Sequence, residues 1–206
     1  IAKGSGMIHP NMGTMLAFIA TDAAITPELL QNALHEVVDR TFNMITVDGD
    51  TSTNDTVFVL ANGKAKNSMI KDKKDPNFTM FKQKLEELMG HLSKLIVSDG
   101  EGASKFITYK VIHAKNEKQA RTIARAISTS SLVKTAMYGR DPNWGRIVSA
   151  AGNAGVPFDY SKIKLSIGTE EKVVEVLDNG QPLEYDKRQM KQMLREPHLV
   201  IEMDMK

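Results

Sequence analysis

The sequence predicts a mixed α/β (α+β) fold, a layered sandwich of sheets and helices. Stretches that alternate every two residues, as strands do, interleave with stretches whose apolar residues recur every three or four positions, as on one face of a helix. Of the 206 residues 41% are hydrophobic, so the chain can bury a substantial core. The sequence shows no internal repeat and no low-complexity linker.

The first third of the chain is predicted to contain a strand, a helix, a second strand and a polar loop. Leu16 to Ala20 alternates as a strand. Thr26 fits a helix N-cap and Pro27 the first helical position, and the apolar residues that follow have the helical period. A β-rich run follows at 57–60, and the charged residues of 64–77 predict a surface loop.

The middle of the chain is predicted to be helical on both sides of one strand. Apolar residues spaced along 78–96 predict a long helix that ends at Asp99-Gly100, because glycine commonly ends helices. Residues 106–112 alternate as a strand. Asn116 can cap a third helix, and a fourth is expected from about Trp144 to Ala151.

The pattern changes past Gly155 to shorter elements. Strands are expected at 163–167, 173–176 and 199–205, with a helix that Asp186 caps between the last two. We therefore expect two parts, a larger sandwich over residues 1–155 and a smaller C-terminal subdomain over residues 156–206.

Charge and hydropathy argue against two classes of partner. Lys and Arg number 27 against 25 Asp and Glu, interspersed along the chain, and a net charge of +2 gives no electrostatic reason to expect nucleic acid. No apolar run approaches the ~20 residues that span a bilayer, and residues 1–6 lack the apolar region of a signal peptide. We therefore expect no membrane partner and a cytoplasmic location.

The residue types limit the chemistry. The chain has no cysteine, which excludes disulfides, thiolate catalysis and Cys-ligated zinc. Its five histidines show no paired metal-ligand spacing, so no metal is expected. A covalent catalyst would therefore be a serine, a threonine, a lysine or a carboxylate.

Glycines, a lysine, hydroxyls and a histidine gather in residues 3–14, before the first predicted strand. A flexible terminus would have a similar composition. A threonine hydroxyl beside a small residue can also attack the preceding carbonyl in a strained loop, and Gly13-Thr14 has this arrangement. Cleavage there would free the α-amino group of Thr14, whose reference pKa near ~8 would allow it to act as base for its own hydroxyl.

Five runs of the sequence are similar to one known family, in the same order and at approximately the same spacing. They are KGSGMIHPNMGTML at 3–16, TVDGDTSTND at 46–55, SDGEGASK at 98–105, LVKTA at 132–136 and YGRDPNWGRI at 138–147. On these runs, which extend over most of the chain, the protein resembles the ornithine acetyltransferase (glutamate N-acetyltransferase) family. The resemblance is to the C-terminal, nucleophile-bearing part of that family.

The resemblance implies an activity and a set of site residues. Members of this family of arginine biosynthesis transfer acetyl from N2-acetylornithine to glutamate by a ping-pong route through an acetyl-threonine. Some also accept acetyl-CoA as a co-substrate, and no other cofactor is implied. By position, Thr14 resembles the nucleophile, Lys3 a substrate-contacting lysine and Glu101 a substrate-binding carboxylate. Lys3 would pair with an α-carboxylate of the substrate and Glu101 with an ammonium group.

The resemblance also implies an assembly. Precursors of the family cut themselves before the nucleophile, here between Gly13 and Thr14, although Gly13 stands where alanine is expected. The two resulting chains form an α-β-β-α-type sandwich and a heterotetramer of two upstream and two downstream chains. The upstream chain, with its oxyanion-hole Thr and Gly, and a C-terminal tail that carries an Asn and a Ser or Thr to the substrate lie outside this sequence.

Because an oxyanion stabiliser is typically worth ~3 kcal/mol in acyl transfer, this chain alone is expected to be a poor enzyme or none. Two alternatives belong to other classes. One is a related N-terminal-nucleophile amidohydrolase or aminopeptidase of similar layered fold, and the other is a non-catalytic regulatory or binding subunit.

Two polar runs allow more than one interpretation. The acidic run from Asp48 to Asp55 alternates like a calcium loop, but Val59 stands where the bidentate Glu of such a loop would be. Its side chains are expected instead to bond backbone groups in a buried turn near the site. The run from Asp141 to Gly145 would either line a pocket or form a turn that caps the next helix.

Overall fold

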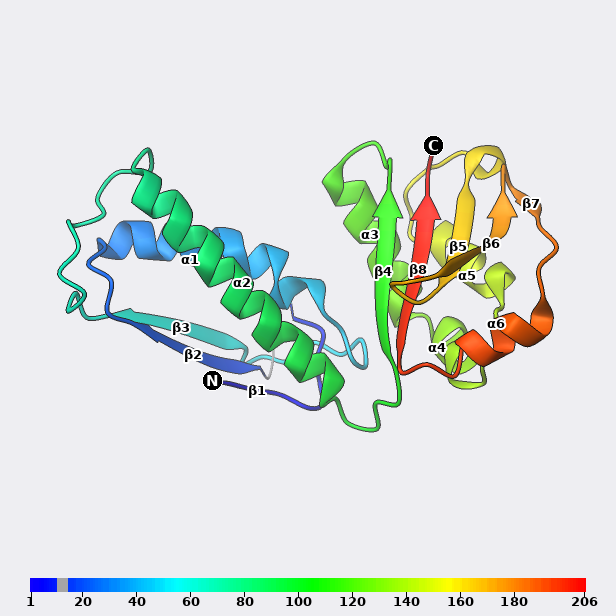
Figure 1. Ribbon diagram of the computed structural model, residues 1–206, viewed down its shortest axis with the longest axis horizontal. Coiled ribbons are helices and arrows are strands. Elements are labelled where there is room, and N and C mark those ends of the chain that lie inside the picture. Colours follow the sequence, from blue (N-terminus) through cyan, green and yellow to red (C-terminus); the bar gives the residue numbers. More distant parts are fainter. Residues whose placement is uncertain (11–14) are drawn as a thin grey trace. The chain divides into compact units, whose positions relative to one another are not determined.

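The computed structural model describes residues 1–10 and 15–206. These residues form two compact units, Ile1–Ala103 (the first unit) and Ser104–Lys206 (the second unit), each built around one sheet (Figure 1). The described residues contain six α-helices and two sheets, so the predicted mixed α/β class is confirmed. The units divide at Ala103, whereas the sequence predicted a division at residue 155.

In the described part of the first unit the sheet has three strands, β1 (Ala2–Lys3), β2 (Leu16–Thr21) and β3 (Thr56–Ala61), in the order β1-β2-β3. β1 pairs antiparallel with β2, and β2 pairs parallel with β3. Parallel neighbours need a long crossover, and α1 (Pro27–Arg40) lies in the connection between them. The short helix η1 (Phe42–Met44) follows α1.

Two helices cover one face of this sheet (Figure 1). α1 begins where Thr26 accepts a hydrogen bond from the Leu29 N–H, with Pro27 in the first turn, as the sequence predicted. α2 (Pro76–Ser98) begins where the Asp75 carboxylate accepts from the Asn77 N–H. Both helices contribute their apolar faces to one buried cluster with β2, which holds this unit together.

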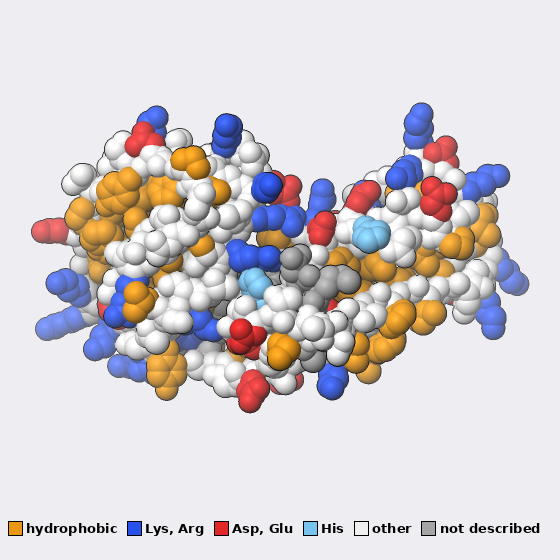
Figure 2. Space-filling view, turned by 180° about the vertical axis from the view of Figure 1, so that it is seen from behind, with side chains coloured by type: hydrophobic (Ala, Val, Ile, Leu, Met, Phe, Trp, Pro, Cys, Tyr) orange, Lys and Arg blue, Asp and Glu red, His pale blue; other side chains and the backbone are white. Residues whose placement is uncertain are grey.

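The opposite face of the same sheet carries exposed apolar side chains. Because side chains alternate along a strand, Ala17 and Ile19 point into the buried cluster while Phe18 points away from it. Phe18 pairs with Phe58, and their rings stack with centroids 5.4 Å apart. Phe18, Phe58 and Leu60 are 46%, 49% and 61% exposed. Figure 2 shows hydrophobic side chains along the lower edge of this unit, where β2 and β3 run.

The second unit has a five-stranded sheet in the order β4-β8-β5-β6-β7. Its strands are β4 (Phe106–Ile112), β5 (Lys164–Gly168), β6 (Val173–Asp178), β7 (Gln181–Pro182) and β8 (His198–Asp204). β4 and β8 pair in parallel, and the other neighbours are antiparallel. The pairing of β4 with β8 joins residues on the two sides of position 155, which explains why this unit does not divide there.

The strand register of the second unit places its core on one face of the sheet. Tyr109 of β4 pairs with Ile201 of β8, which in turn pairs with Ile167 of β5, and all three side chains join one apolar cluster. Burial raises the pKa of the Tyr109 hydroxyl, because ionisation would place a charge in this environment.

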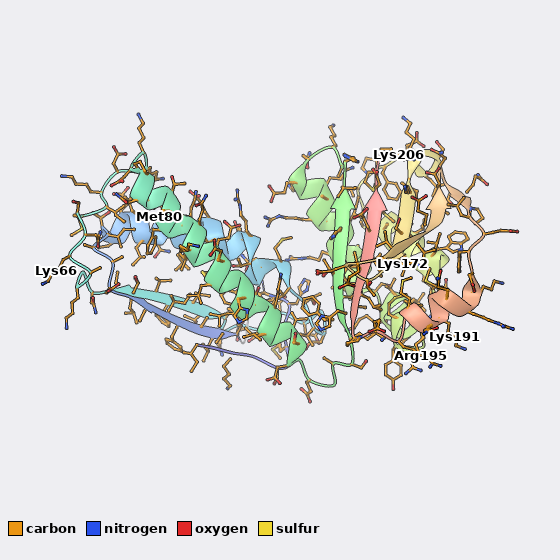
Figure 3. All side chains as sticks on the ribbon, in the orientation of Figure 1. Lys66, Met80, Lys172, Lys191, Arg195 and Lys206 are labelled. Atoms are coloured by element: carbon orange, nitrogen blue, oxygen red, sulfur yellow. The ribbon has the colours of Figure 1, made fainter. Side chains whose placement is uncertain are left out.

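Four helices of the second unit contribute to that cluster. They are α3 (Glu117–Thr129), α4 (Ser131–Tyr138), α5 (Trp144–Gly152) and α6 (Lys187–Met193), and the short helix η2 (Tyr160–Lys162) precedes β5. In Figure 3, Lys191 lies on α6, Arg195 follows it, and Lys172 lies in the connection between β5 and β6. None of the helices in the described ranges is long and apolar enough to cross a membrane.

Candidate functional site

The predicted nucleophile lies outside the described residues. Gly13 and Thr14 both fall in the gap between Pro10 and Met15, so the predicted cleavage site and nucleophile stay predictions. The structure does describe what holds the chain immediately before and after this gap. The residues on both sides belong to the first unit.

Lys3 lies in β1, directly beside the start of β2. It pairs with Leu16, and its neighbour Ala2 pairs with Ala17. The Lys3 side chain is exposed. Antiparallel pairing therefore fixes Lys3 next to the segment that follows the gap, with its side chain exposed to solvent.

Glu101 lies in the turn after α2, against the glycine-rich loop that follows β1. Its backbone N–H donates a 2.7 Å hydrogen bond to the Ser5 carbonyl. Its carboxylate lies beside Gly6, where a Cβ atom would stand 2.7 Å from Glu101 Oε2. The structure thus brings two of the predicted site residues, Lys3 and Glu101, to the same short loop.

A third run of the sequence, 46–55, meets both of these segments. The Val47 N–H donates to the Ile8 carbonyl at 2.6 Å. Gly100 packs so closely on Val47 that a Cβ atom at position 100 would lie 2.9 Å from Val47 Cγ1. Three of the five runs that carry the resemblance therefore meet within the first unit, and the runs at 132–136 and 138–147 belong to the second unit.

Asp48 binds the backbone on the N-terminal side of the gap. Its carboxylate accepts hydrogen bonds from the N–H groups of Met7 at 2.6 Å and Ile8 at 3.0 Å. It also accepts from the Asp50 N–H at 3.0 Å, which closes its own turn. Met7 has a φ of 56°, in the left-handed region that residues with a side chain seldom adopt, and the Asp48 bond holds it there.

Asp55 binds the backbone on the C-terminal side of the gap. Its carboxylate accepts a hydrogen bond from the Met15 N–H, and the neighbouring Thr56 N–H donates to the Met15 carbonyl at 2.8 Å. Burial raises the pKa of the Asp55 carboxyl, and the hydrogen bond from Met15 opposes that rise by stabilising the carboxylate.

These contacts confirm that side chains of the run 48–55 bond backbone groups, but the expected buried turn is wrong, because Ser52 is the one buried residue of this run and Asp48 is exposed. The partners themselves were missed, because Met7 and Met15 are each about forty positions away and no local pattern indicates such a pairing. His9 was interpreted only as a residue without metal-ligand spacing. Its Nδ1 lies 2.9 Å from Thr46 Oγ1, and its carbonyl accepts from Thr51 Oγ1 at 3.0 Å.

The run from Asp141 to Gly145 forms a helix cap. Asn143 Oδ1 accepts from the Arg146 N–H at 3.2 Å and begins α5, which agrees with the second of the two interpretations of this run. Across residues 1–10 and 15–206, no three His, Asp or Glu side chains gather in a way that could hold a metal ion.

Comparison with known proteins decides the family. The model of the ArgJ family matches residues 1–206. The chain belongs to the ArgJ family. It is 47% identical over 204 residues to the arginine biosynthesis bifunctional protein ArgJ of Oceanobacillus iheyensis, which covers 99% of this chain and 49% of that protein. It is 51% identical to the protein of the same name from a Synechococcus species, over 95% of this chain and 46% of that protein.

A solved ArgJ structure agrees with the fold. The crystal structure of the arginine biosynthesis bifunctional protein ArgJ from Bacillus halodurans superposes with a TM-score of 0.87 at 39% sequence identity, covering 93% of this chain and 88% of that chain. The resemblance inferred from the five sequence runs is therefore confirmed at the level of the family. The chain spans about half the length of the curated ArgJ relatives that it matches.

Proposed function

We propose that this ArgJ-family chain, together with its upstream half, transfers acetyl from N2-acetylornithine to glutamate through an acetyl group carried on Thr14. The observation that carries the proposal is the meeting of Lys3, the loop that leads to Thr14, and Glu101 in one unit. A cation at the start of the glycine-rich loop and a carboxylate that packs against this loop suit a zwitterionic amino-acid substrate. The names of the relatives, arginine biosynthesis bifunctional proteins, agree with this chemistry.

The proposed reaction has two half-reactions. In the first, the Thr14 hydroxyl attacks the acetyl carbonyl of N2-acetylornithine, the amide C–N bond breaks, and the hydroxyl proton passes to the leaving amine of ornithine. In the second, the amine of glutamate attacks the acetyl ester, the ester C–O bond breaks, and the proton returns to the Thr14 oxygen. The freed α-amino group of Thr14 would carry this proton in both directions.

The amine of Thr14 becomes available only after self-cleavage. The Thr14 hydroxyl attacks the Gly13 carbonyl, the acyl group moves from nitrogen to oxygen, and water hydrolyses the ester. Cleavage leaves Gly13 with a carboxylate and Thr14 with a free amine. The same oxygen thus serves once in processing and then in every turnover.

The proposed partner is the upstream half of the same precursor. Its oxyanion-hole Thr and Gly would stabilise the tetrahedral intermediate. The proposal assigns this stabilisation to the upstream half alone. The sheet face formed by Phe18, Phe58 and Leu60 offers this half an apolar surface. We propose a cytoplasmic heterotetramer of two upstream and two downstream chains, with acetyl-CoA as an optional co-substrate and no metal or other cofactor.

A label-transfer assay tests the proposed function. Full-length protein is incubated with N2-acetylornithine labelled in the acetyl group, and acetylglutamate and free acetate are measured with and without glutamate. The proposal predicts label in acetylglutamate and little free acetate. Free acetate as the main product would instead indicate an amidohydrolase, and no turnover of either kind would indicate a non-catalytic subunit.

Removing the charge of Glu101 is expected to weaken substrate binding without affecting processing. Glu101→Gln should raise KM for N2-acetylornithine about 10-fold, because a charge-assisted hydrogen bond to the substrate ammonium is lost. Self-cleavage should continue at the wild-type rate, since the nucleophile is untouched. Steady-state kinetics and intact mass measure the two effects. An unchanged KM would remove Glu101 from the site.

A methyl group at Gly6 is expected to reproduce part of the Glu101→Gln effect. The Cβ atom of Gly6→Ala would stand 2.7 Å from Glu101 Oε2, so the flexible carboxylate must move while the backbone stays in place. KM for N2-acetylornithine should rise by about 3-fold to 10-fold with little change in melting temperature. Gly152→Ala, which meets nothing within 4 Å, is the matched control. Equal KM values for the two variants would contradict the placement of Glu101.

A further inference from the structure

Both flanks of segment 11–14 are bound by a single loop, residues 46–56. Before the segment, Asp48 accepts from two consecutive N–H groups, those of Met7 and Ile8, and Thr51 donates to the His9 carbonyl. After the segment, Asp55 accepts from the Met15 N–H. One loop thus determines where the chain enters the segment and where it leaves.

The two carboxylates are suited to this task. An ionised carboxylate is the strongest hydrogen-bond acceptor among the side chains, and its bonds to backbone N–H groups are short and directional. Asp48 uses both of its oxygens, Oδ2 for Met7 and Oδ1 for Ile8. The N–H that Asp55 binds belongs to the peptide bond between Thr14 and Met15, so Asp55 acts on the covalent neighbour of the proposed nucleophile.

Pairing within the sheet strengthens the C-terminal attachment. The Thr56 N–H donates to the Met15 carbonyl, and Met15 is almost fully buried in the core of the first unit. The N–H of Met15 is therefore bound by Asp55, immediately before β3, and its carbonyl by Thr56, the first residue of β3. In a turn exposed to water, solvent could satisfy the N–H and the carbonyl of Met15, and neither of these two hydrogen bonds would be needed.

We propose that Asp48 and Asp55 are positioning residues that fix the two ends of the nucleophile segment for self-cleavage and acetyl transfer. This inference rests on the proposed function, because it assumes that Thr14 is the nucleophile. Effective attack needs the hydroxyl within a few tenths of an ångström of its productive place, and a shift of ~1 Å costs about 100-fold in rate. Neither carboxylate needs to touch the substrate.

The test uses full-length precursor with four substitutions made singly. Asp55→Ala removes the acceptor for the Met15 N–H, and Asp55→Asn removes the charge but keeps an acceptor oxygen. Asp48→Ala removes both bonds on the other flank at an exposed side chain, so it leaves the core intact. Asp72→Ala is the matched control, because Asp72 also accepts a backbone N–H, that of Lys74, in the same unit but at another loop.

Three quantities are measured for each variant: the rate of cleavage before Thr14 by intact mass, the melting temperature, and kcat and KM for N2-acetylornithine. Asp55→Ala and Asp48→Ala should each slow cleavage and lower kcat by about 10-fold to 100-fold, with KM changed less than about 3-fold. Asp55→Asn should stay within about 10-fold of wild type, since the hydrogen bond can still form. Asp72→Ala should match wild type.

Other outcomes overturn the inference. If wild type is cleaved and acetylated at Thr14 while Asp55→Ala and Asp48→Ala match Asp72→Ala, positioning by these carboxylates is wrong and the proposed function stands. If Asp55→Asn folds as wild type but is as slow as Asp55→Ala, the negative charge of Asp55 is what the reaction needs, and not its hydrogen bond from the Met15 N–H. Positioning by Asp55 is then wrong as well. If wild type is neither cleaved nor acetylated at Thr14, the proposed function and the inference both fall.

Discussion

Replacing Thr14 with alanine is expected to abolish both precursor cleavage and acetyl transfer. Both reactions require the same hydroxyl oxygen, so one substitution removes them together. Loss of a nucleophile lowers turnover by roughly 10⁴-fold or more in related acyl-transfer chemistry. Intact mass after expression measures the cleavage, and formation of acetylglutamate from N2-acetylornithine measures the transfer.

Thr14→Ser is the control for this prediction. Serine keeps the hydroxyl but loses the methyl group that restricts rotation about χ1, so both reactions should continue at reduced rates. A Thr14→Ala protein that is still cut, or that still transfers acetyl at more than a few per cent of the wild-type rate, would exclude Thr14 as the shared nucleophile.

Separating this chain from its upstream half is expected to lower acetyl transfer by about 10³-fold or more, because the oxyanion donors are absent. Adding the separately produced upstream half should restore activity to the level of the co-expressed protein. Analytical ultracentrifugation of the mixture should show an assembly larger than either part. Full activity of the isolated chain would contradict the proposed division of the site.

A charged residue in the exposed sheet face should block this reconstitution. Phe58→Asp places a carboxylate beside the stacked Phe18 ring on the face assigned to the upstream half. Burying an unpaired charge there should weaken association by several kcal/mol. Met80→Asp is the matched control, since Met80 is 56% exposed and lies on α2, away from β2 and β3 in the sequence (Figure 3). If Phe58→Asp assembles as well as the control, the upstream half binds elsewhere.

Local patterning predicted most of the secondary structure. The long helix predicted to end at Asp99-Gly100 is α2, and the strand predicted at 106–112 is β4. Caps at Thr26, Asn116 and Asp186 all accept hydrogen bonds from the first turns of their helices. These elements depend on neighbours a few positions away, which a sequence displays directly.

Elements that depend on distant partners were not predicted. α4 has eight residues, too few to show a repeating apolar face, so no helix was predicted there. The two-residue strand β1 exists through its pairing with β2. The division at Ala103 reflects the pairing of Phe106 with His198, more than ninety positions away.

The candidate site shows the same contrast. Motif resemblance selected Lys3 and Glu101, and the structure brings both to one loop, although their roles stay predictions. The carboxylates of Asp48 and Asp55 were expected to bond backbone groups, but their partners lie on the other side of α1 in the sequence. Such tertiary hydrogen bonds have no periodicity, so a single sequence does not indicate them.

The central claim, that Thr14 carries the acetyl group, is tested most directly by mass spectrometry of the trapped intermediate. Full-length wild-type protein is incubated with N2-acetylornithine without glutamate, quenched in acid, and its downstream fragment is mapped by peptide mass. The account predicts a fragment that begins at Thr14 and carries one acetyl group on that residue. A chain that stays whole while it transfers acetyl normally, or an acetyl group on another residue, would contradict it.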